Sequence, residues 1–192
     1  MIDEIQNFKN YLTQVITIDN KSFDMSIEYL KIERICKGEY FVKDGQVCSK
    51  IAYIHEGLFR IYYLKDGIEI NTCFCNEDSI TSSFNSFINH IPSNENIQAL
   101  ENSVVVTLSF ENLEKLYLES PIWQTISRLL TEKECLRLSD RASSLSFESA
   151  MEKYKNLLKY QPEIIQRASV QHIASYIGVS RETLSRIRAK IG

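Results

Sequence analysis

Hydrophobic residues change their spacing twice along the chain. Near the N-terminus, Ile5, Phe8, Leu12 and Val15 recur at intervals of three and four, so we expect residues 1–33 to be largely helical and polar, with one apolar stripe. In the middle of the chain, short runs rich in Tyr, Phe, Ile and Val alternate with turn residues, a pattern typical of β-strands. The last part of the chain returns to helical spacing.

Several short strands are predicted between Ile35 and Phe110, separated by tight turns. The turns place Gly45, Gly57 and Gly67 where the backbone needs a positive φ. The predicted strands cover residues 50–54, 58–64, 68–74, 97–100 and 104–108. Many short strands at a spacing of roughly ten residues indicate a β-roll or a barrel.

One segment, residues 76–96, breaks the strand pattern and is rich in Ser, Asn and Phe. We expect it to form a pocket-lining loop or a short helix. The candidate residues of an effector pocket are Ser82, Ser83, Phe84 and Asn94.

Two helices are predicted after the strands, over residues 111–119 and from Pro121 onward, since proline suits the first turn of a helix. Ile122, Leu129 and Leu136 are seven residues apart and form a partial heptad seam. This long helix either packs on its own β-roll or pairs with a copy of itself across a two-fold axis. A serine-rich stretch, residues 139–149, is predicted to be a hinge, and a further helix covers residues 150–160.

The region from Ser169 to Ile191 predicts two short helices joined by a turn at Gly178. Ser169 and Ser180 are each placed to cap a helix N-terminus. The predicted inner faces consist of Ile173, Ala174, Ile177, Leu184 and Ile187. A small residue, a glycine and apolar residues at these offsets are typical of a helix-turn-helix, and the alternative is an ordinary helical hairpin.

The outer face of the second helix carries the chemistry of base recognition. Arginine binds the O6 and N7 atoms of guanine, glutamate accepts a hydrogen bond from N4 of cytosine, and short hydroxyl side chains suit phosphate. The predicted DNA-binding residues are Gln171, Ser180, Arg181, Glu182, Thr183, Ser185, Arg186, Arg188 and Lys190. In the alternative interpretation, Glu182 and Arg186 form a surface ion pair one helical turn apart.

Charge is distributed unevenly over the 192 residues, whose formal net charge is -3. Residues 149–192 contain eight Lys or Arg and three Glu, a net charge of +5. Residues 1–148 contain 14 basic and 22 acidic residues, a net charge of -8. A basic C-terminal segment is expected of a polyanion-binding domain, although a solvated helix face has the same composition.

The remaining composition excludes several classes of protein. No run approaches the roughly 18 apolar residues of a membrane helix, and the acidic N-terminus is unlike a signal peptide, so we expect no membrane partner and a cytoplasmic location. The five cysteines are therefore expected to be free. Cys73 and Cys75 would share one face of a strand, either as small buried residues or as a metal or redox pair.

A β-roll, a long helix and a C-terminal helix-turn-helix together resemble the Crp/Fnr family of bacterial transcription regulators. The resemblance is strongest in the run GVSRETLSR at residues 178–186, and weaker at Gly38, Gly45, Gly57 and Gly67 and at AYI (52–54) and RIY (60–62). It implies an α+β fold with a cupin-like, double-stranded β-helical roll, flanking helices, a long dimerisation helix and the helix-turn-helix. It also implies that Arg181, Glu182 and Arg186 read bases.

The same resemblance implies a domain organisation and partners. The expected domains are a cyclic-nucleotide-binding-like sensor at residues 1–120, a dimerisation helix and hinge at 121–145, and a DNA-binding domain at 146–192. A homodimer formed through residues 121–144 would bind a pseudo-palindromic site in double-stranded DNA, with RNA polymerase as a further partner.

The chain departs from the cyclic-nucleotide-binding members of the family. No Gly-Glu pair occurs near the end of the roll, and no Lys or Arg lies between Lys65 and Lys115, so a buried cyclic phosphate would lack a cation. We therefore expect no cAMP or cGMP, and no iron–sulfur or haem cofactor. The alternatives are a cyclic-nucleotide-responsive regulator and a cupin-type metal enzyme. His55, His90 and His172 are too scattered to predict a metal site, so we expect no enzyme.

Overall fold

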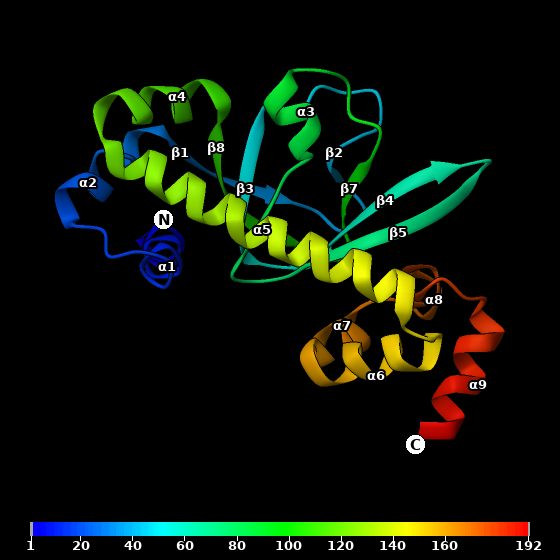
Figure 1. The fold of residues 1–192 in the computed structure, drawn as a ribbon. Helices are drawn as coiled ribbons and strands as arrows, with labels where there is room; N and C mark the ends of the chain where they lie inside the picture. The colour runs from blue at the N-terminus through cyan, green and yellow to red at the C-terminus, as the bar shows by residue number, and fades with distance from the viewer. Residues whose placement is uncertain (1, 192) are drawn as a thin grey trace.

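Two four-stranded antiparallel sheets share one core and form a roll flanked by helices (Figure 1). A computed structural model describes residues 2–191. The strand orders are β1-β8-β3-β6 and β2-β7-β4-β5. The strands are β1 (Leu30–Ile35), β2 (Tyr40–Val42), β3 (Lys50–Glu56), β4 (Phe59–Lys65), β5 (Ile68–Cys75), β6 (Ser79–Thr81), β7 (Asn96–Ala99) and β8 (Ser103–Ser109). The predicted α+β fold with a β-roll and a long helix is confirmed.

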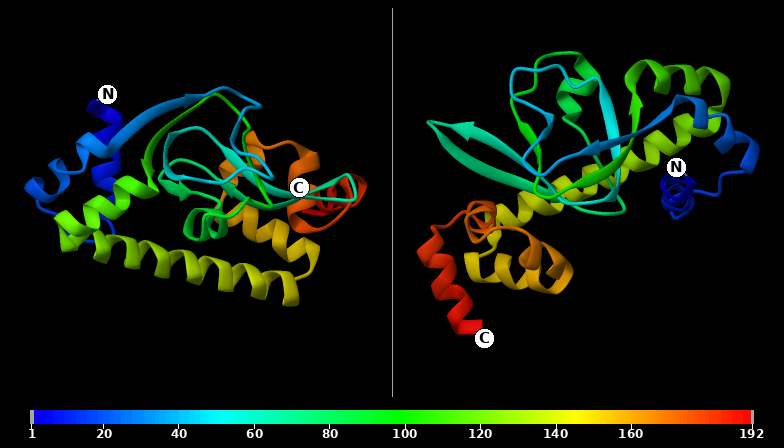
Figure 2. Two further views of the ribbon diagram at one scale, coloured as in Figure 1. Left: turned by 90° about the horizontal axis from the view of Figure 1, so that it is seen from above. Right: turned by 180° about the vertical axis from the view of Figure 1, so that it is seen from behind.

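Helices precede and follow the roll, and α5 runs from the N-terminal helices to the C-terminal ones (Figures 1 and 2). They are α1 (Ile2–Thr13), α2 (Asn20–Asp24), the 3-10 helix η1 (Ile27–Tyr29), α3 (Phe84–Asn89), α4 (Phe110–Glu119), α5 (Pro121–Phe147), α6 (Ala150–Tyr160), α7 (Pro162–Arg167), α8 (Val170–Ile177) and α9 (Arg181–Ile191). No helix within residues 2–191 is long and apolar enough to cross a membrane.

The prediction that residues 1–33 are largely helical is wrong from Leu30 onward. Six consecutive residues of β1 pair with β8, so the backbone of this segment is satisfied by a strand more than 60 residues away. The predicted apolar stripe is correct at Phe8 and Leu12, which are buried in α1, whereas Val15 lies beyond the end of that helix.

The five predicted strands are all present, with ends shifted by one or two residues. The predicted turn at Gly57 is confirmed by a φ of +118° and by its close packing. A Cβ atom at Gly57 would lie 2.0 Å from Oγ of Ser103, so only glycine fits this position. The predictions missed β1, β2 and β6. β2 and β6 have three residues each, too few to show an alternating pattern.

Most of the predicted hinge at residues 139–149 has helical backbone, because α5 continues through Ser139, Ser143, Ser144 and Ser146 to Phe147. Ser144 donates to the carboxylate of Glu148 at 2.7 Å, and Ser146 donates to the carbonyl of Ala142 at 2.9 Å. Hydroxyls bonded in this way are compatible with a continuous helix, although such bonds can bend it slightly. The change of direction is confined to Glu148 and Ser149, and a capping box of Ser149 and Glu152 starts α6.

The C-terminal helices have a second hydrophobic core of their own. It contains buried residues of α6, α7, α8 and α9, together with Leu58 and Phe74 of the roll. The first core lies between the two sheets and includes Trp123 and Ile126 from the first half of α5. β5 therefore lies between the two cores, with Cys73 and Cys75 facing the first and Phe74 facing the second.

Candidate nucleic-acid interface

Local sequence signals set the geometry of α8 and α9. Oγ of Ser169 accepts a hydrogen bond from the amide of His172 at 3.1 Å, and Oγ of Ser180 accepts one from the amide of Thr183 at 3.2 Å. Gly178 has a φ of +81°, in the left-handed region that the turn requires. These observations confirm both predicted caps and the predicted glycine turn.

The predicted inner faces of the two helices are buried as expected. Leu184 and Ile173 are fully buried, Ala174 and Ile177 are 1% exposed, and Ile187 is 7% exposed. Burying an aliphatic side chain of this size contributes about 1.5–3 kcal/mol, so the core holds α9 in one rotational setting. The outer face of α9 is determined by this packing.

That outer face projects into solvent at the end of the molecule opposite α1 and α2 (Figures 1 and 2). Its exposed members from the predicted set are Arg181, Glu182, Ser185, Arg186 and Lys190, and Gln171 is exposed on α8. Within residues 2–191, neither Arg181 nor Arg186 forms an ion pair, so the surface pair of Glu182 with Arg186 in the alternative interpretation is absent. Both guanidinium groups are available to a ligand.

The carboxylate of Glu182 lies at the N-terminus of α9. Hydrogen bonds from its own backbone amide and from Ser180 lower its pKa, and the nearby Arg181 and Arg186 add to this effect. Glu182 is therefore ionised at neutral pH between two arginines. An ionised carboxylate can accept a hydrogen bond from a base or orient the arginines beside it.

Two basic residues of the C-terminal segment are engaged by the protein itself. Arg188 is half-buried, with its guanidinium 5.7 Å from the ring centroid of Tyr154, so it faces α6 instead of the exposed strip. Arg167 forms ion pairs with Glu77 and Glu101 of the roll. The charge of Arg167 is thereby compensated and adds nothing to a field directed at DNA.

The Arg167 ion pairs connect α7 to the loops of the roll. Nη1 and Nη2 of Arg167 donate to the two carboxylate oxygens of Glu77 at 2.8 and 2.7 Å, and the amide of Gly57 donates to Glu77 at 2.8 Å. Burial raises the pKa of Glu77, but these hydrogen bonds outweigh that effect and hold the pKa at about 2, below its ordinary value of 4.5.

We expect this contact to stabilise the protein above about pH 4.5 and to be lost as the pH falls toward 2, because Glu77 must then be protonated. Urea unfolding of the wild type and of Glu77→Gln should differ most at pH 6, and the difference should shrink steadily as the pH falls toward 2. Equal unfolding midpoints of wild type and Glu77→Gln at pH 6 would contradict this expectation.

Contacts between α8 and β5 join the two cores, and sequence reasoning missed them. Oγ of Ser175 accepts from the amide of Asn71 at 2.9 Å and donates to the carbonyl of Glu69 at 2.8 Å. The rings of Phe74 and Tyr176 lie 5.3 Å apart between centroids. The alternation of side chains along β5 could have indicated this contact, since it places Phe74 on the face of the strand opposite Cys73.

The candidate effector-pocket residues differ in their burial. Ser82 and Ser83 are buried, with Ser83 Oγ 2.9 Å from Oγ of Ser93 and Ser82 donating to the carbonyl of Lys50 at 3.2 Å. Phe84 is half-buried and Asn94 is exposed. Neither of the two hollows described on residues 2–191 is lined by them.

Sequence reasoning also missed a buried arginine in the roll. Arg60 of β4 is 4% exposed, donates twice to Gln98 and forms an ion pair with Glu69 at 2.5 Å. Its guanidinium lies 4.0 Å from the ring centroid of Tyr62. The charge of Arg60 is thus compensated within the protein.

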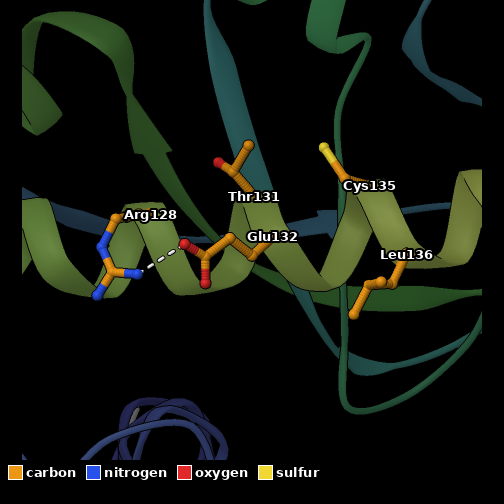
Figure 3. A pocket seen from close by; sticks show the side chains of 5 residues that line it. All are labelled: Arg128, Thr131, Glu132, Cys135 and Leu136. Atoms are coloured by element: carbon orange, nitrogen blue, oxygen red, sulfur yellow. Dashed lines mark hydrogen bonds and ion pairs between the residues drawn. The ribbon is translucent and has the colours of Figure 1, made fainter.

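The long helix packs on the roll near its N-terminus and leaves another face, around residues 128–136, open. Trp123 and Ile126 are 2% exposed, whereas Leu136 is 69% exposed. A shallow hollow along this open face is lined by Arg128, Thr131, Glu132, Cys135 and Leu136 (Figure 3). Of the predicted heptad seam, Ile122 packs against the first core and Leu136 belongs to the open face.

Comparison with known proteins agrees with this architecture. Residues 32–120 match the family described as the cyclic nucleotide-binding domain. No curated protein sequence matches the chain significantly.

Solved structures share the fold over most of the chain. The c-di-GMP-responsive global regulator CLP of Xanthomonas campestris is 20% identical, with a TM-score of 0.72 over 90% of this chain and 91% of that chain. A putative Crp/Fnr-family transcriptional regulator of Eubacterium rectale is 16% identical, with a TM-score of 0.71 over 94% and 87% of the two chains. FixK2 of Bradyrhizobium japonicum is 18% identical, with a TM-score of 0.69 over 84% of each. Together, the domain match over residues 32–120 and these structures show that the chain has the fold of the Crp/Fnr regulators.

Proposed function

We propose that this protein is a transcription regulator that binds a pseudo-palindromic site in double-stranded DNA as a homodimer. The observation that carries the proposal is the exposed strip of α9, where Arg181, Glu182, Ser185 and Arg186 face solvent on a rigidly packed helix. An α-helix fits the major groove, and its guanidinium and carboxylate groups match the edges of G·C base pairs. Gln171, Thr183 and Lys190 lie beside the strip and suit phosphate contacts.

The dimer would form through the open face of α5. Two copies of this helix, related by a two-fold axis, would cover Leu136 and the hollow around it. A symmetric dimer presents two α9 helices to successive major grooves, about 34–36 Å apart on one side of the duplex. The fold shared with the Crp/Fnr regulators supports this arrangement. We propose RNA polymerase as a further partner of the DNA-bound dimer.

The roll would serve as the sensor domain, and we expect neither cAMP nor cGMP to be its effector. No Lys or Arg lies between Lys65 and Lys115, and the buried Arg60 is already paired with Glu69. The second candidate function is a cyclic-nucleotide-responsive regulator, which the family match of residues 32–120 favours. Isothermal titration with cAMP, cGMP and c-di-GMP tests it directly, the last because CLP is described as responsive to that molecule.

Selection of bound duplexes from a random DNA pool tests the proposed function. We expect enrichment of an inverted repeat whose half-site centres are about 10 base pairs apart, or one further helical turn apart. Enrichment of a single unpaired half-site would contradict the dimer. No enrichment from the pool, at low salt and with the reduced protein, would contradict DNA recognition.

Affinity should fall steeply with salt, because each phosphate neutralised by Lys or Arg releases counterions. If the dimer neutralises six to ten phosphates, binding should weaken roughly 10³- to 10⁵-fold between 50 and 200 mM salt. Fluorescence anisotropy over that range measures the slope of the logarithm of the binding constant against the logarithm of the salt concentration. Lys190→Ala should make this slope shallower by about 1 for each phosphate contact removed. A flat salt response would show that DNA is not the partner.

A further inference from the structure

Cys73 and Cys75 form a buried dithiol on β5, at the boundary between the two cores. The side chains are two residues apart on one face of the strand, and each is 8% exposed. Their sulfur atoms are 3.7 Å apart. In a regular strand, alternate Cα atoms lie about 6.6 Å apart, within the range that a disulfide spans.

A guanidinium group from α5 contacts this dithiol. Nη1 of Arg137 donates to Sγ of Cys73 at 3.3 Å. Glu134 holds the guanidinium in place by accepting from Nε at 2.8 Å and from Nη2 at 2.6 Å. A hydrogen bond from Cys75 and the charge of Arg137 lower the pKa of Cys73, whereas the hydrogen bond to Cys73 and burial raise the pKa of Cys75.

The two sulfurs therefore have different roles. Cys73 is the sulfur that the surroundings favour as a thiolate, which is the nucleophilic form of cysteine. Cys75 remains a protonated thiol beside it, placed to react second. A positive guanidinium next to the sulfur also opposes a metal cation, and no group of three or more metal ligands occurs within residues 2–191. The geometry favours oxidation chemistry over metal binding.

The dithiol is joined to the C-terminal helices through its immediate neighbours. Phe74, between the two cysteines, packs its ring on Tyr176 of α8. Arg141, one helical turn beyond Arg137, lies 3.8 Å from the Tyr176 ring centroid and donates to the Tyr176 carbonyl at 2.5 Å. Any change in the path of β5 at residues 73–75 must therefore alter the surface on which α8 rests.

We propose that Cys73 and Cys75 are a hydroperoxide-sensitive pair whose oxidation to a disulfide loosens the contact between β5 and α8. The Cys73 thiolate attacks one oxygen of the hydroperoxide, an S–O bond forms, the O–O bond breaks, and the released alkoxide or hydroxide takes up a proton. Sγ of Cys75 then attacks the sulfenic acid at Sγ of Cys73. The S–O bond breaks, and the hydroxide leaves as water with the proton of Cys75. Two thiols are oxidised by two electrons, and the hydroperoxide is reduced to an alcohol, or to water if it is hydrogen peroxide, plus one further water.

Closing the disulfide brings the sulfurs from 3.7 Å to about 2.05 Å. This movement reshapes β5 and removes the thiolate to which Arg137 donates. The hydrogen bond between the Asn71 amide and Ser175 lies two residues from Cys73, within reach of the change. The inference does not depend on the proposed function, because it concerns the chemistry of this chain alone.

The test uses the full chain carrying Cys36→Ser and Cys135→Ser, so that the exposed thiols cannot cross-link copies. Hydrogen peroxide is added to the reduced protein, and alkylation followed by peptide mass spectrometry is used to assign the oxidised cysteines. We expect the peptide that holds both cysteines to be about 2 mass units lighter than its reduced form, because disulfide formation removes one hydrogen from each thiol. Buried Cys48 serves as an internal control and should remain alkylatable after denaturation. Oxidation of Cys48 as fast as the pair would overturn the proposal.

Two sets of variants separate the steps. In the Cys75→Ser variant, oxidation should stop at a sulfenic acid on Cys73, which a cyclic dione reagent traps. In the Cys73→Ser variant, Cys75 should remain unoxidised. Arg137→Gln should slow disulfide formation by about tenfold, because less of Cys73 is then thiolate. Arg128→Gln is the matched control, since Arg128 is exposed on the same helix and also pairs with a glutamate. Equal rates for both arginine variants and the parent would overturn the role of Arg137.

Hydrogen–deuterium exchange reports the coupling to α8. Oxidation should speed exchange of the amides in residues 170–177 by about threefold or more, as expected when a local contact is lost. Disulfide formation with unchanged exchange there would overturn the coupling. Binding of zinc or copper(I) to the reduced pair in preference to oxidation would overturn the assignment as a whole.

Discussion

Replacing Arg181 or Arg186 by alanine should strongly weaken binding to the selected operator. Each guanidinium is exposed on α9, forms no ion pair within residues 2–191, and lies on the helix face that packing directs outward. Loss of an arginine that binds guanine costs about 1–3 kcal/mol, roughly 5- to 150-fold in affinity. The preference should also relax at one position in each half-site. Binding of each variant to the selected operator and to its single-base variants measures both effects.

Arg34→Ala is the matched control for these variants. Arg34 is exposed on β1 and forms no ion pair in the part of the chain that the structure describes. Its replacement by alanine removes one positive charge, as the α9 substitutions do. It should bind the operator like the wild type. If the α9 variants lose equal affinity for operator and random duplex, the arginines contact only phosphate. Unchanged operator binding by both α9 variants would remove α9 from the interface.

The helices of this candidate interface were predictable because their signals are local. Ser169, Gly178 and Ser180 act within three or four residues of their own positions, through a cap, a left-handed turn and a second cap. The apolar residues between them follow the helical period. Each of these signals can be read without knowledge of the rest of the chain.

The errors arose where a distant partner decides the outcome. β1 is a strand because β8 pairs with it, and nothing within residues 30–35 specifies that partner. Arg188 was placed on the outer face by its position in the helix, but Tyr154 of α6 holds it against the protein. Arg167 was counted with the DNA-directed charge, although Glu77 and Glu101 compensate it. Tertiary contacts of this kind have no signature in a single sequence.

The helical backbone of most of the serine-rich stretch has a different explanation. Serine disfavours helix interiors because its hydroxyl competes for backbone hydrogen bonds. In α5, the hydroxyl of Ser146 instead donates to the carbonyl of Ala142 one turn earlier, and that of Ser144 donates to Glu148, which caps the helix. Because this part of α5 is helical, Arg141 lies one turn beyond Arg137: Arg137 contacts β5 and Arg141 contacts α8, so α5 connects the roll to the C-terminal helices here.

Leu136→Glu should separate the proposed dimer and thereby remove binding to the palindromic operator. Leu136 is 69% exposed, so the substitution leaves the fold of each copy intact. In a two-fold contact, however, it places two carboxylates close together beside Glu132 of each copy, and an unpaired charge buried there is costly. Sedimentation equilibrium should show monomers. Affinity for the palindrome should fall about 10²- to 10⁴-fold, which is the gain that two linked sites provide.

Leu118→Glu is the control, because Leu118 is 89% exposed on α4, outside α5 and its open face. It should dimerise and bind DNA like the wild type. Binding of Leu136→Glu to a duplex with a single half-site should equal that of the wild-type monomer, since α9 is unaltered. This result would separate loss of the dimer from loss of the recognition surface. A stable dimer of Leu136→Glu with full operator affinity would show that the two copies meet through another surface, and that the open face of α5 has a different role.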